Sequence, residues 1–492
     1  MKVLLVYPKY PNTFWSFDYA LKFVSKKASM PPLGLLTVAS LLPHDWNKKL
    51  VDCNVRALED REILWADLVF ISAMIVQKTH AQEIIKRCKY FNKTVVAGGP
   101  VFTTQSENFS GADHFVLNEA EATLPKFLDD FINGKAKRIY RSKQRPDITK
   151  TPLPDWSLIN LKNYATMAVQ YSRGCPHNCE FCDIVIMNGR IPRIKTPGQI
   201  IKELEALYKA GWRESIFFVD DNFIGNKLHV KKMLAHLILW QKRHKFPFRF
   251  LTEATADLAK DERLMRMMSA ANFCKVFLGI ETPDIDSLKE CGKYHNTNLN
   301  LAEAVKTIQA HGMQVMGGFI VGFDNDKTTI FDRQIRFIQQ VGIVTAMVGL
   351  LNATPQTRLW HRLKAEGRLL KETTGENTDG SLNFIPKMDT EKLIEGYKKI
   401  LRTIYSSTDY YKRINIFIRN YKPTAISKIN RADFFAFIKS LWKIGVLSKS
   451  RFRYWWLLFK TAATKAKALP IAIELAIYGQ HFEKVTKRIL SV

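Results

Sequence analysis

Short apolar runs alternate with helical segments over the first 135 residues. The apolar runs, rich in Val, Ile and Leu, span 3–7, 49–54, 67–73, 94–99 and 114–117. Apolar residues recur at helical spacing over 35–42, 81–88 and 124–131. Strand and helix in turn predict a parallel sheet covered on both faces. We therefore expect a five-stranded, doubly wound α/β domain of Rossmann-like type over residues 1–140.

The carboxyl ends of these strands are the expected ligand-binding rim, as in other open α/β sheets. Tyr7-Pro8, residues 72–77 and Gly98-Gly99-Pro100 fall there. Gly98-Gly99-Pro100 can also be explained as a tight strand-to-helix turn without a ligand.

A second alternation follows a linker at 141–164, which contains Pro146, Pro152 and Pro154. Its candidate strands span 165–172, 215–221, 248–254, 275–281, 314–323 and 345–351. Six βα units with right-handed crossovers predict a partial (β/α)6 barrel of the TIM type over 165–370, with its chemistry at the carboxyl ends of the strands.

Charge sets the last part of the chain apart. The 492 residues contain 74 Lys and Arg against 46 Asp and Glu, and 46% are hydrophobic, which excludes a disordered chain. Residues 411–492 hold 17 Lys and Arg and 3 acids, so 17 − 3 = +14 of the net +28 lies there. We expect a basic, helical C-terminal domain over 371–492.

Cysteine usage and the N-terminus suggest a compartment. Seven cysteines are too few for a disulfide scaffold, which favours a reducing environment. MKVLLVYPKY runs directly into a strand, without the cleavage site of a secretory signal, and no apolar stretch reaches the ~20 residues of a membrane span. We expect a cytoplasmic protein.

Three cysteines form the strongest motif. Cys175, Cys179 and Cys182 stand in a C-x3-C-x2-C loop after the first expected barrel strand. Three thiolates can hold three corners of a cuboidal iron–sulfur cluster and leave the fourth iron open. The alternative is a structural zinc site with His177 or a remote cysteine as fourth ligand.

This loop, with Phe181 before Cys182, resembles that of the radical S-adenosylmethionine (SAM) enzymes, and the resemblance covers about 165–355. It implies a [4Fe-4S] cluster on Cys175, Cys179 and Cys182, SAM chelated to the open iron, and release of a 5′-deoxyadenosyl radical after one-electron reduction. It also implies SAM contacts from later strand ends. The candidates are Phe181, Asp220, Asp221, Asn222, Glu253, Glu281 and Gly318. The acidic groups can instead be rim salt bridges, and the glycine can serve close packing.

The N-terminal domain resembles the cobalamin (B12)-binding domain that precedes the barrel in one class of these enzymes. Residues 31–36, 98–100 and 118–121 are the matching segments. The implied cobalamin contacts are Met74, Ile75, Gln77, Gly98, Gly99, Pro100, Glu119 and Glu121. Two departures are evident: no D-x-H-x-x-G motif supplies a histidine below cobalt, so residues 74–77 are placed at its lower face, and Asn118 replaces the usual glycine.

Within that class, the chain looks most like the hopanoid C-2 methylase branch. The resemblance implies methyl transfer to an unactivated carbon of a lipid-like substrate, with a reductase or flavodoxin-type electron donor. This scheme requires no general acid or base pair, so no catalytic side chain is assigned. The alternative is a cobalamin-binding radical SAM oxidoreductase or cyclase acting on a small metabolite. Two others fit less well: tRNA thiomethylation requires three N-terminal cysteines where only Cys53 and Cys88 stand, and a cobalamin sensor has no use for the cysteine triad.

The C-terminal charge suggests a surface. Residues 451–460 mix bulky aromatics with cations, as interfacial helices do, so we expect 411–492 to contact the cytoplasmic face of an anionic membrane. A helical cap with a solvated basic face is the plainer explanation. Nucleic-acid binding is a third explanation, which the positive charge of this segment permits.

Overall fold

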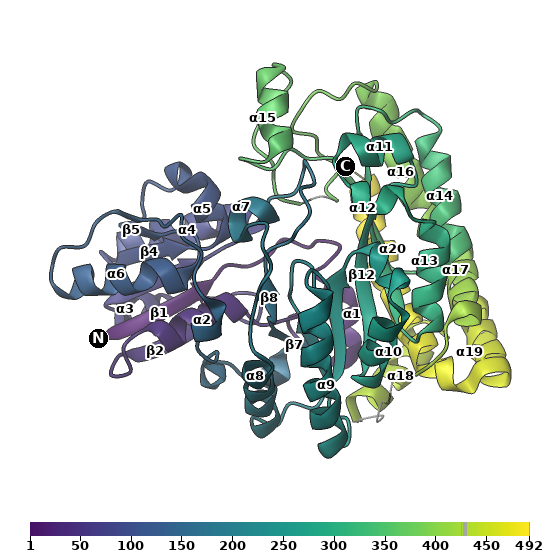
Figure 1. The fold of residues 1–492 in the computed structure, drawn as a ribbon, viewed down its shortest axis with the longest axis horizontal. Coiled ribbons are helices and arrows are strands. Elements are labelled where there is room, and N and C mark those ends of the chain that lie inside the picture. Colours follow the sequence, from purple (N-terminus) through teal and green to yellow (C-terminus); the bar gives the residue numbers. More distant parts are fainter. Residues whose placement is uncertain (377, 425, 427–430, 492) are drawn as a thin grey trace.

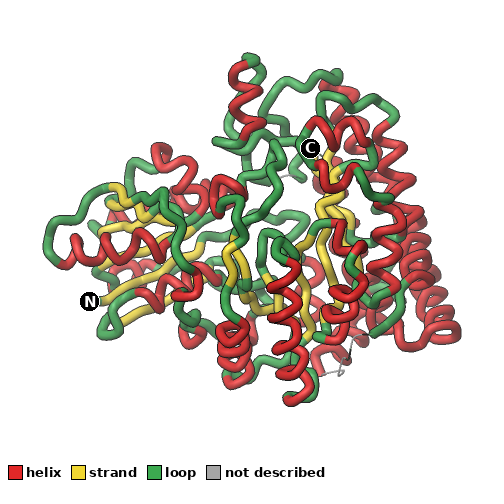
Figure 2. Tube along the Cα trace, viewed as in Figure 1, coloured by secondary structure: helices red, strands yellow, loops and turns green. Residues whose placement is uncertain are grey.

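The structure is a computed structural model that describes residues 1–376, 378–424, 426 and 431–491. Two parallel sheets stand side by side, and helices from the end of the chain pack along the outer side of the second sheet (Figure 1). Loops join the two sheets across the middle of the molecule (Figure 2). The α/β class with a helical C-terminus is as expected.

The N-terminal sheet has the strand order β2-β1-β3-β4-β5-β6, with every pair parallel. Its strands are β1 (Lys2–Tyr7), β2 (Asn47–Asp52), β3 (Leu68–Ser72), β4 (Thr94–Gly98), β5 (His114–Val116) and β6 (Ile139–Tyr140). The expectation of five strands was wrong by one. The two residues of β6 are too few to show a hydrophobic period, so the pattern could not reveal them.

Helices cover both faces of this sheet, as continuous apolar strands require. Val3 and Leu5 of β1 face one core, which α2 (Leu33–Leu41) and α6 (Ala120–Ile132) share, whereas Leu4 and Val6 face a second core. That second core contains α3 (Asp60–Trp65), α4 (Lys78–Tyr90) and α5 (Pro100–Gln105). The alternation of side chains along one strand thus separates the two layers of helices.

The second sheet is an open barrel with the order β14-β13-β12-β11-β10-β7, all parallel. Its strands are β7 (Thr166–Val169), β10 (Ser215–Phe218), β11 (Arg249–Ala254), β12 (Phe273–Glu281), β13 (Gln314–Val321) and β14 (Ala346–Leu350). Each of the six expected segments forms one of these strands. The main connecting helices are α8 (Pro197–Lys209), α9 (Lys227–Arg243), α10 (Glu262–Ala270), α13 (Leu301–Ala310) and α14 (Ile330–Val341).

Shorter elements line the carboxyl end of the barrel. They are the hairpin β8 (Ser172–Arg173) and β9 (Arg193–Ile194), and the helices α7 (Ile184–Asn188), α11 (Ile285–Glu290), α12 (Tyr294–Thr297) and α15 (Arg358–Ala365). In Figure 1, α11, α12 and α15 stand above the sheet. They mark the end of the barrel where the cysteine loop begins.

The C-terminal region consists of α16 (Thr390–Ile404), α17 (Ser407–Asn420), α18 (Arg431–Lys443), α19 (Arg451–Lys465) and α20 (Leu469–Leu490). α20 contacts α1 (Asp18–Val24), which belongs to the N-terminal part of the chain. Phe14 stacks on Phe482 with 4.5 Å between ring centroids, and its carbonyl oxygen lies 2.9 Å from Nε2 of His481. The two ends of the chain are thus packed together beside the barrel. In the part of the chain that the structure describes, no helix has the length and apolarity to cross a bilayer. The domain limits expected at 140, 164 and 370 stay predictions.

Candidate active site

The three cysteines of the motif lie where β7 ends, on the loop of residues 170–182. All three are free and partly buried. The Cys175 amide donates to the Gly189 carbonyl at 3.2 Å, and the Cys182 amide donates to the Cys179 carbonyl at 3.2 Å, which folds the loop back on itself. The loop therefore presents its thiols at the carboxyl end of the barrel.

Two neighbouring carboxylates at the end of β10 hold this loop. Asp220 accepts hydrogen bonds from the amides of Tyr171, at 3.2 Å, and Ser172, and Asp221 accepts one from the Gly174 amide at 2.7 Å. Gly174 has φ +102°, and a Cβ there would lie 2.9 Å from the Ile191 carbonyl oxygen. Glycine is needed at 174 because the backbone approaches so closely. The two aspartates thus anchor the cluster loop, and their contact with SAM stays a prediction.

The donor set fits a [4Fe-4S] cluster. Burial raises the pKa of all three thiols, and each thiolate near Cys182 raises that pKa further, so stable thiolates call for a positive partner such as iron. Within the described residues, no three or more His, Cys, Asp or Glu side chains are grouped around one point that could hold a single metal ion. A cuboidal cluster places each thiolate on a different iron, so its ligands need not converge on one point. His177, the alternative fourth ligand of a zinc site, stacks its ring on that of His295, with 3.6 Å between ring centroids.

Several buried polar atoms beside the loop are available to a ligand. Oδ1 of Asn222 has no hydrogen-bond partner within the described structure, while Nδ2 of Asn222 lies 3.9 Å from Sγ of Cys175. Burial, followed by the charges of Asp221 and Asp220, raises the pKa of Glu253 to about 7. An orphaned polar atom, and an acid that makes no ion pair within the described residues, suit a ligand with amino and hydroxyl groups, as SAM has.

Glu281 and Gly318 have clear structural partners. Glu281 forms an ion pair with Lys293 at 2.5 Å, and a Cβ on Gly279 would lie 2.6 Å from both charged groups. A Cβ on Gly318 would lie 2.8 Å from the Phe277 ring. Phe181 packs in a small apolar cluster and lies 6.3 Å from Phe323, centroid to centroid. Packing accounts for these positions, and their SAM contacts stay predictions.

The rim of the N-terminal domain has a closely packed backbone. Gly99 has φ +92°, and a Cβ there would lie 2.6 Å from Oγ of Ser72, so glycine is required. Pro100 begins α5, as proline favours. Gln77 accepts from the Met74 amide at 2.8 Å and donates to the Pro8 carbonyl, which fixes residues 74–77 while Met74 stays half exposed.

The rim also fits a large polar ligand. Gly98 leaves no room for a side chain, since a Cβ would lie 2.8 Å from the Val116 carbonyl oxygen. Nε2 of Gln105 and Oδ1 of Asn118 are buried without hydrogen-bond partners in the described residues. Asn118 has φ 65°, a left-handed conformation that glycine and asparagine both tolerate. The substitution that departed from the family pattern therefore keeps the local backbone shape.

Segment 372–376 of the C-terminal region lies against this rim. Glu372 pairs with Lys78 and accepts from Nδ2 of Asn108 at 2.9 Å. A Cβ on Gly375 would lie 2.7 Å from the Val76 amide. The rim is thus bordered by a segment about 300 residues away along the chain, which sequence patterns could not reveal.

Glu119 and Glu121 lie at the junction of the two sheets. Arg173 contacts Glu119 at 2.9 Å and Glu121 at 2.7 Å, and Arg193 contacts Glu119 at 2.8 Å. Both arginines belong to the β8–β9 hairpin beside the cysteines. These two carboxylates therefore join the N-terminal domain to the cluster loop. Their predicted contact with cobalamin is untested.

Two arginines that fix the loop were not predicted from the sequence. Arg173 stands two residues before Cys175, and Arg362 of α15 holds Glu180 at 2.8 Å. The signal in the sequence was the position of Arg173 inside the cysteine loop, because a charged residue needs a partner when it is buried.

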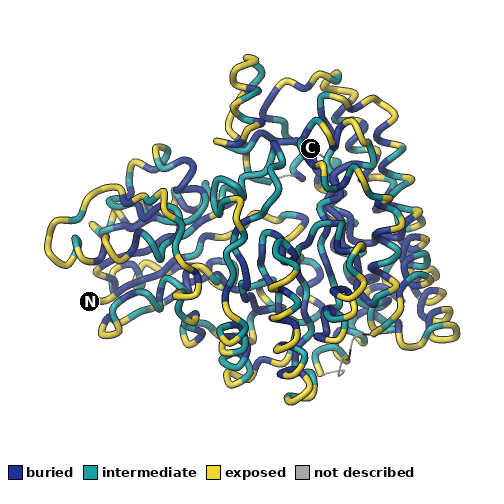
Figure 3. Tube along the Cα trace, in the orientation of Figure 1, coloured by how far each residue is buried: buried dark blue, intermediate teal, exposed yellow. Residues whose placement is uncertain are grey.

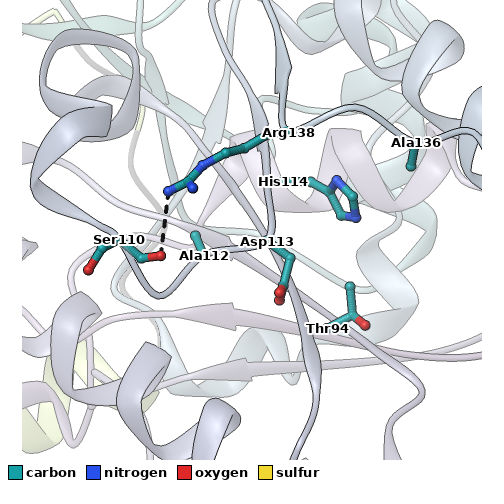
Figure 4. A pocket seen from close by; sticks show the side chains of 7 residues that line it. All are labelled: Thr94, Ser110, Ala112, Asp113, His114, Ala136 and Arg138. Atoms are coloured by element: carbon teal, nitrogen blue, oxygen red, sulfur yellow. Dashed lines mark hydrogen bonds between the residues drawn. The ribbon is translucent and has the colours of Figure 1, made fainter.

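The cavity of about 460 Å³ drawn in Figure 4 lies elsewhere. Thr94 and His114, which line it, are the first residues of β4 and β5, so it opens at the amino ends of those strands. It lies at the opposite end of the sheet from the rim.

Three stretches of the chain match known families. Residues 23–128 match the B12 binding domain, residues 169–337 the radical SAM superfamily, and residues 357–491 a domain of unknown function, DUF4070. The matches follow the order of the two sheets and the C-terminal helices.

Two solved structures share the fold. The cobalamin-dependent S-adenosylmethionine radical enzyme OxsB, with aqua-cobalamin bound, aligns over 100% of this chain and 80% of its own at 14% identity, with a TM-score of 0.66. The radical S-adenosylmethionine methyltransferase TsrM from Kitasatospora setae, with cobalamin and a [4Fe-4S] cluster bound, aligns over 92% of this chain and 97% of its own at 14% identity, with a TM-score of 0.63.

Two full-length relatives are closer in sequence. An uncharacterized methyltransferase of Synechocystis sp. is 44% identical over 98% of this chain and 91% of its own length. The hopanoid C-2 methylase of Rhodopseudomonas palustris is 34% identical over 92% of this chain and 88% of its own. The cofactors are therefore a [4Fe-4S] cluster, SAM and cobalamin, and the chain belongs to the cobalamin-dependent radical SAM methyltransferase family that includes the hopanoid C-2 methylase.

Proposed function

We propose that this enzyme methylates an unactivated carbon of a lipid-like, hopanoid-type substrate. The supporting observation is the 34% identity to the hopanoid C-2 methylase, in an alignment that covers 92% of this chain and 88% of that protein.

The chain holds its two cofactor regions in a fixed relation. When bound, SAM on the cluster supplies the radical that removes hydrogen, and cobalamin supplies the methyl group. We assign the cluster to Cys175, Cys179 and Cys182, and SAM to the polar atoms of Asn222 and Glu253. The rim residues 74–77 and 98–100 would hold cobalamin.

Arg173 is the link between these regions. It pairs with Glu119 and Glu121 of the N-terminal domain and lies in the same strand hairpin as the start of the cluster loop. This ion-pair network would keep the distance and orientation between the two regions constant. A substrate bound between them would therefore be oriented for reaction.

Apolar surface is available between the domains. Trp15, from the loop after β1, meets Phe277 of β12 edge to face with 5.4 Å between ring centroids, and both rings are partly exposed. A polycyclic lipid would pack against such rings, whereas a small polar metabolite would not.

We further propose that a flavodoxin-type protein or reductase delivers the electron and that the enzyme works in the cytoplasm. The second candidate function is a cyclisation without methyl transfer. It is favoured by a 22% identity, over 68% of this chain, to an anaerobic magnesium-protoporphyrin IX monomethyl ester cyclase of Synechocystis sp..

Product analysis separates the two functions. The full chain would be reconstituted anaerobically with iron, sulfide and cobalamin, then supplied with reductant, methyl-deuterated SAM and hopanoid lipid in detergent. We expect a lipid that carries the deuterated methyl group by mass spectrometry, and no product with Cys175→Ala. SAM cleavage without a methylated lipid, together with conversion of a porphyrin substrate, would favour the cyclase.

A further inference from the structure

Helices α18 and α19 each expose a stripe of aromatic rings. On α19, Phe452, Trp456 and Phe459 follow helical spacing and are 75%, 61% and 71% exposed. On α18, Phe434, Phe435 and Trp442 are also more than half exposed. We call these six residues the aromatic face. In Figure 3, α19 lies at the lower right of the molecule and carries many exposed positions, drawn in yellow.

The opposite sides of the same helices are buried. Tyr454 and Leu457 of α19 lie in the core, and the Tyr454 hydroxyl is 2.7 Å from Oγ of Ser440 on α18. A surface helix that meets only water carries polar residues on its outer side, whereas these helices are apolar on both. Six rings, each more than half exposed, present roughly several hundred Å² of aromatic surface, as interaction sites do.

Trp455 differs from its neighbour. Its indole Nε1 donates to the Gly445 carbonyl at 3.0 Å, and a Cβ on Gly445 would lie 3.2 Å from its ring. Trp455 therefore holds the turn between α18 and α19, whereas Trp456 is 61% exposed. Only one member of the tryptophan pair belongs to the aromatic face.

Positive charge surrounds the rings. Residues 431–465 contain 8 Lys and Arg and 1 acid, a net charge of 8 − 1 = +7. Lys449 and Lys460 are exposed beside the rings, and the Arg451 guanidinium carbon lies 5.0 Å from the Phe452 ring centroid. Such a mixture is typical of helices that lie in the headgroup layer of anionic bilayers. Two copies of this chain would repel each other through the same surface.

We propose that the aromatic face docks the enzyme on an anionic lipid bilayer, with its rings among the lipid headgroups and the flanking Lys and Arg on the lipid phosphates. This deepens the proposed function, on which it rests, by naming the surface that holds the enzyme at the membrane in which a lipid substrate lies.

The aromatic face lies at the foot of the barrel. Thr424 and Ile426, which precede α18, contact Gly312 and Asn272 at the amino ends of β13 and β12. Nζ of Lys439 on α18 donates to Oγ of Ser25, next to α1, at 2.7 Å. The cysteine loop lies at the other end of the strands, so docking leaves the cluster end free for an electron donor.

The test is co-sedimentation of the full chain with phosphatidylglycerol–phosphatidylcholine vesicles and with phosphatidylcholine vesicles. The variants are the triple Phe452→Ala/Trp456→Ala/Phe459→Ala and the double Lys449→Gln/Lys460→Gln. The matched control is Tyr90→Ala, which removes an exposed aromatic ring from α4 of the N-terminal domain. Methylation of lipid in detergent is measured on each protein in parallel.

We expect tight binding to the anionic vesicles only. The triple variant should lower the bound fraction at least about ten-fold, and the double variant should lower it several-fold at low salt, with Tyr90→Ala unchanged. Equal vesicle binding by the triple variant, dimerisation through the face, or binding to tRNA or duplex DNA in place of vesicles would overturn the proposal. Vesicle binding without any methylated lipid in detergent would instead refute the proposed function and leave the docking surface standing.

Discussion

The cysteine loop and the rim of the N-terminal domain are built in opposite ways. The loop gathers its chemistry within eight residues, Cys175 to Cys182, and two adjacent aspartates hold its backbone. The rim draws on the ends of several strands and on segment 372–376 from the C-terminal region. Chemistry concentrated in a short segment depends on residue type, whereas a surface assembled from distant loops depends on backbone shape. Substitutions should therefore act sharply in the first region and gradually in the second.

The largest expected effect is that of Cys175→Ala. Loss of one thiolate leaves an iron corner without its ligand, so iron content and SAM cleavage should fall to background while cobalamin binding persists. Iron analysis, SAM cleavage and cobalamin titration on the same sample would show this. Cys88→Ala, which removes a buried thiol from the N-terminal domain, should keep its iron. Loss of cobalamin in Cys175→Ala would show that the two regions are not separable.

Arg173→Met tests the junction between the regions. It leaves the largely buried Glu121 without its arginine, so we expect a stability loss of roughly 2 to 4 kcal/mol and a drop in methyl transfer larger than that in SAM cleavage. Arg173→Lys should restore part of both, as seen by thermal unfolding and product ratio. An unchanged ratio of methyl transfer to SAM cleavage would show that the junction does not align the two cofactors.

The same ion pair predicts a pH dependence. Burial raises the pKa of Glu121, but the hydrogen bond and charge of Arg173 outweigh it and hold that pKa below its usual 4.5. The stability that this pair contributes is present above pH 4.5 and is lost as the pH falls through the lowered value. Acid unfolding of Arg173→Met should therefore be shallower below pH 4.5 than that of the unmodified protein, as unfolding curves at several pH values would show.

Glu253→Gln should stabilise the cofactor-free protein. The pKa of Glu253 is raised from 4.5 to about 7, so its contribution to stability is full below 4.5 and falls as the pH rises through 7. At pH 8 we expect the variant to be more stable by up to about 3 kcal/mol and to bind SAM more weakly. Glu391→Gln, on the exposed side of α16, is the control. Equal stability of Glu253→Gln and the unmodified chain from pH 5 to 8 would contradict this role.

Met74→Ala should have the smallest effect. Met74 is half exposed on the rim, so its loss should change stability by less than about 0.5 kcal/mol and weaken cobalamin binding several-fold, with iron content unchanged. Cobalamin titration measures this, and Leu64→Ala removes another half-exposed apolar side chain as a control. Unaltered cobalamin affinity would contradict the placement of residues 74–77 at the lower face of cobalt.

The sequence predicts the periodic parts of the fold well, for physical reasons. The strands of both sheets appear as apolar runs because both faces of each sheet are buried, and the cysteine spacing predicts which loop holds the cluster. The two-residue strand β6 has no period to detect. The partners of Glu119 and Glu121, the ion pair of Glu281 and the packing of Gly318 against Phe277 depend on contacts between distant segments, which no local pattern carries.

Metal stoichiometry tests the central claim, that one chain carries both cofactors in two distinct regions, most directly. Anaerobically reconstituted full-length protein would be analysed for iron and cobalt, with the optical spectrum recorded on the same sample. The account predicts about four iron atoms and about one cobalt atom per chain, with iron lost selectively in Cys175→Ala. Iron without cobalt at saturating cobalamin, or a colourless zinc protein, would contradict it.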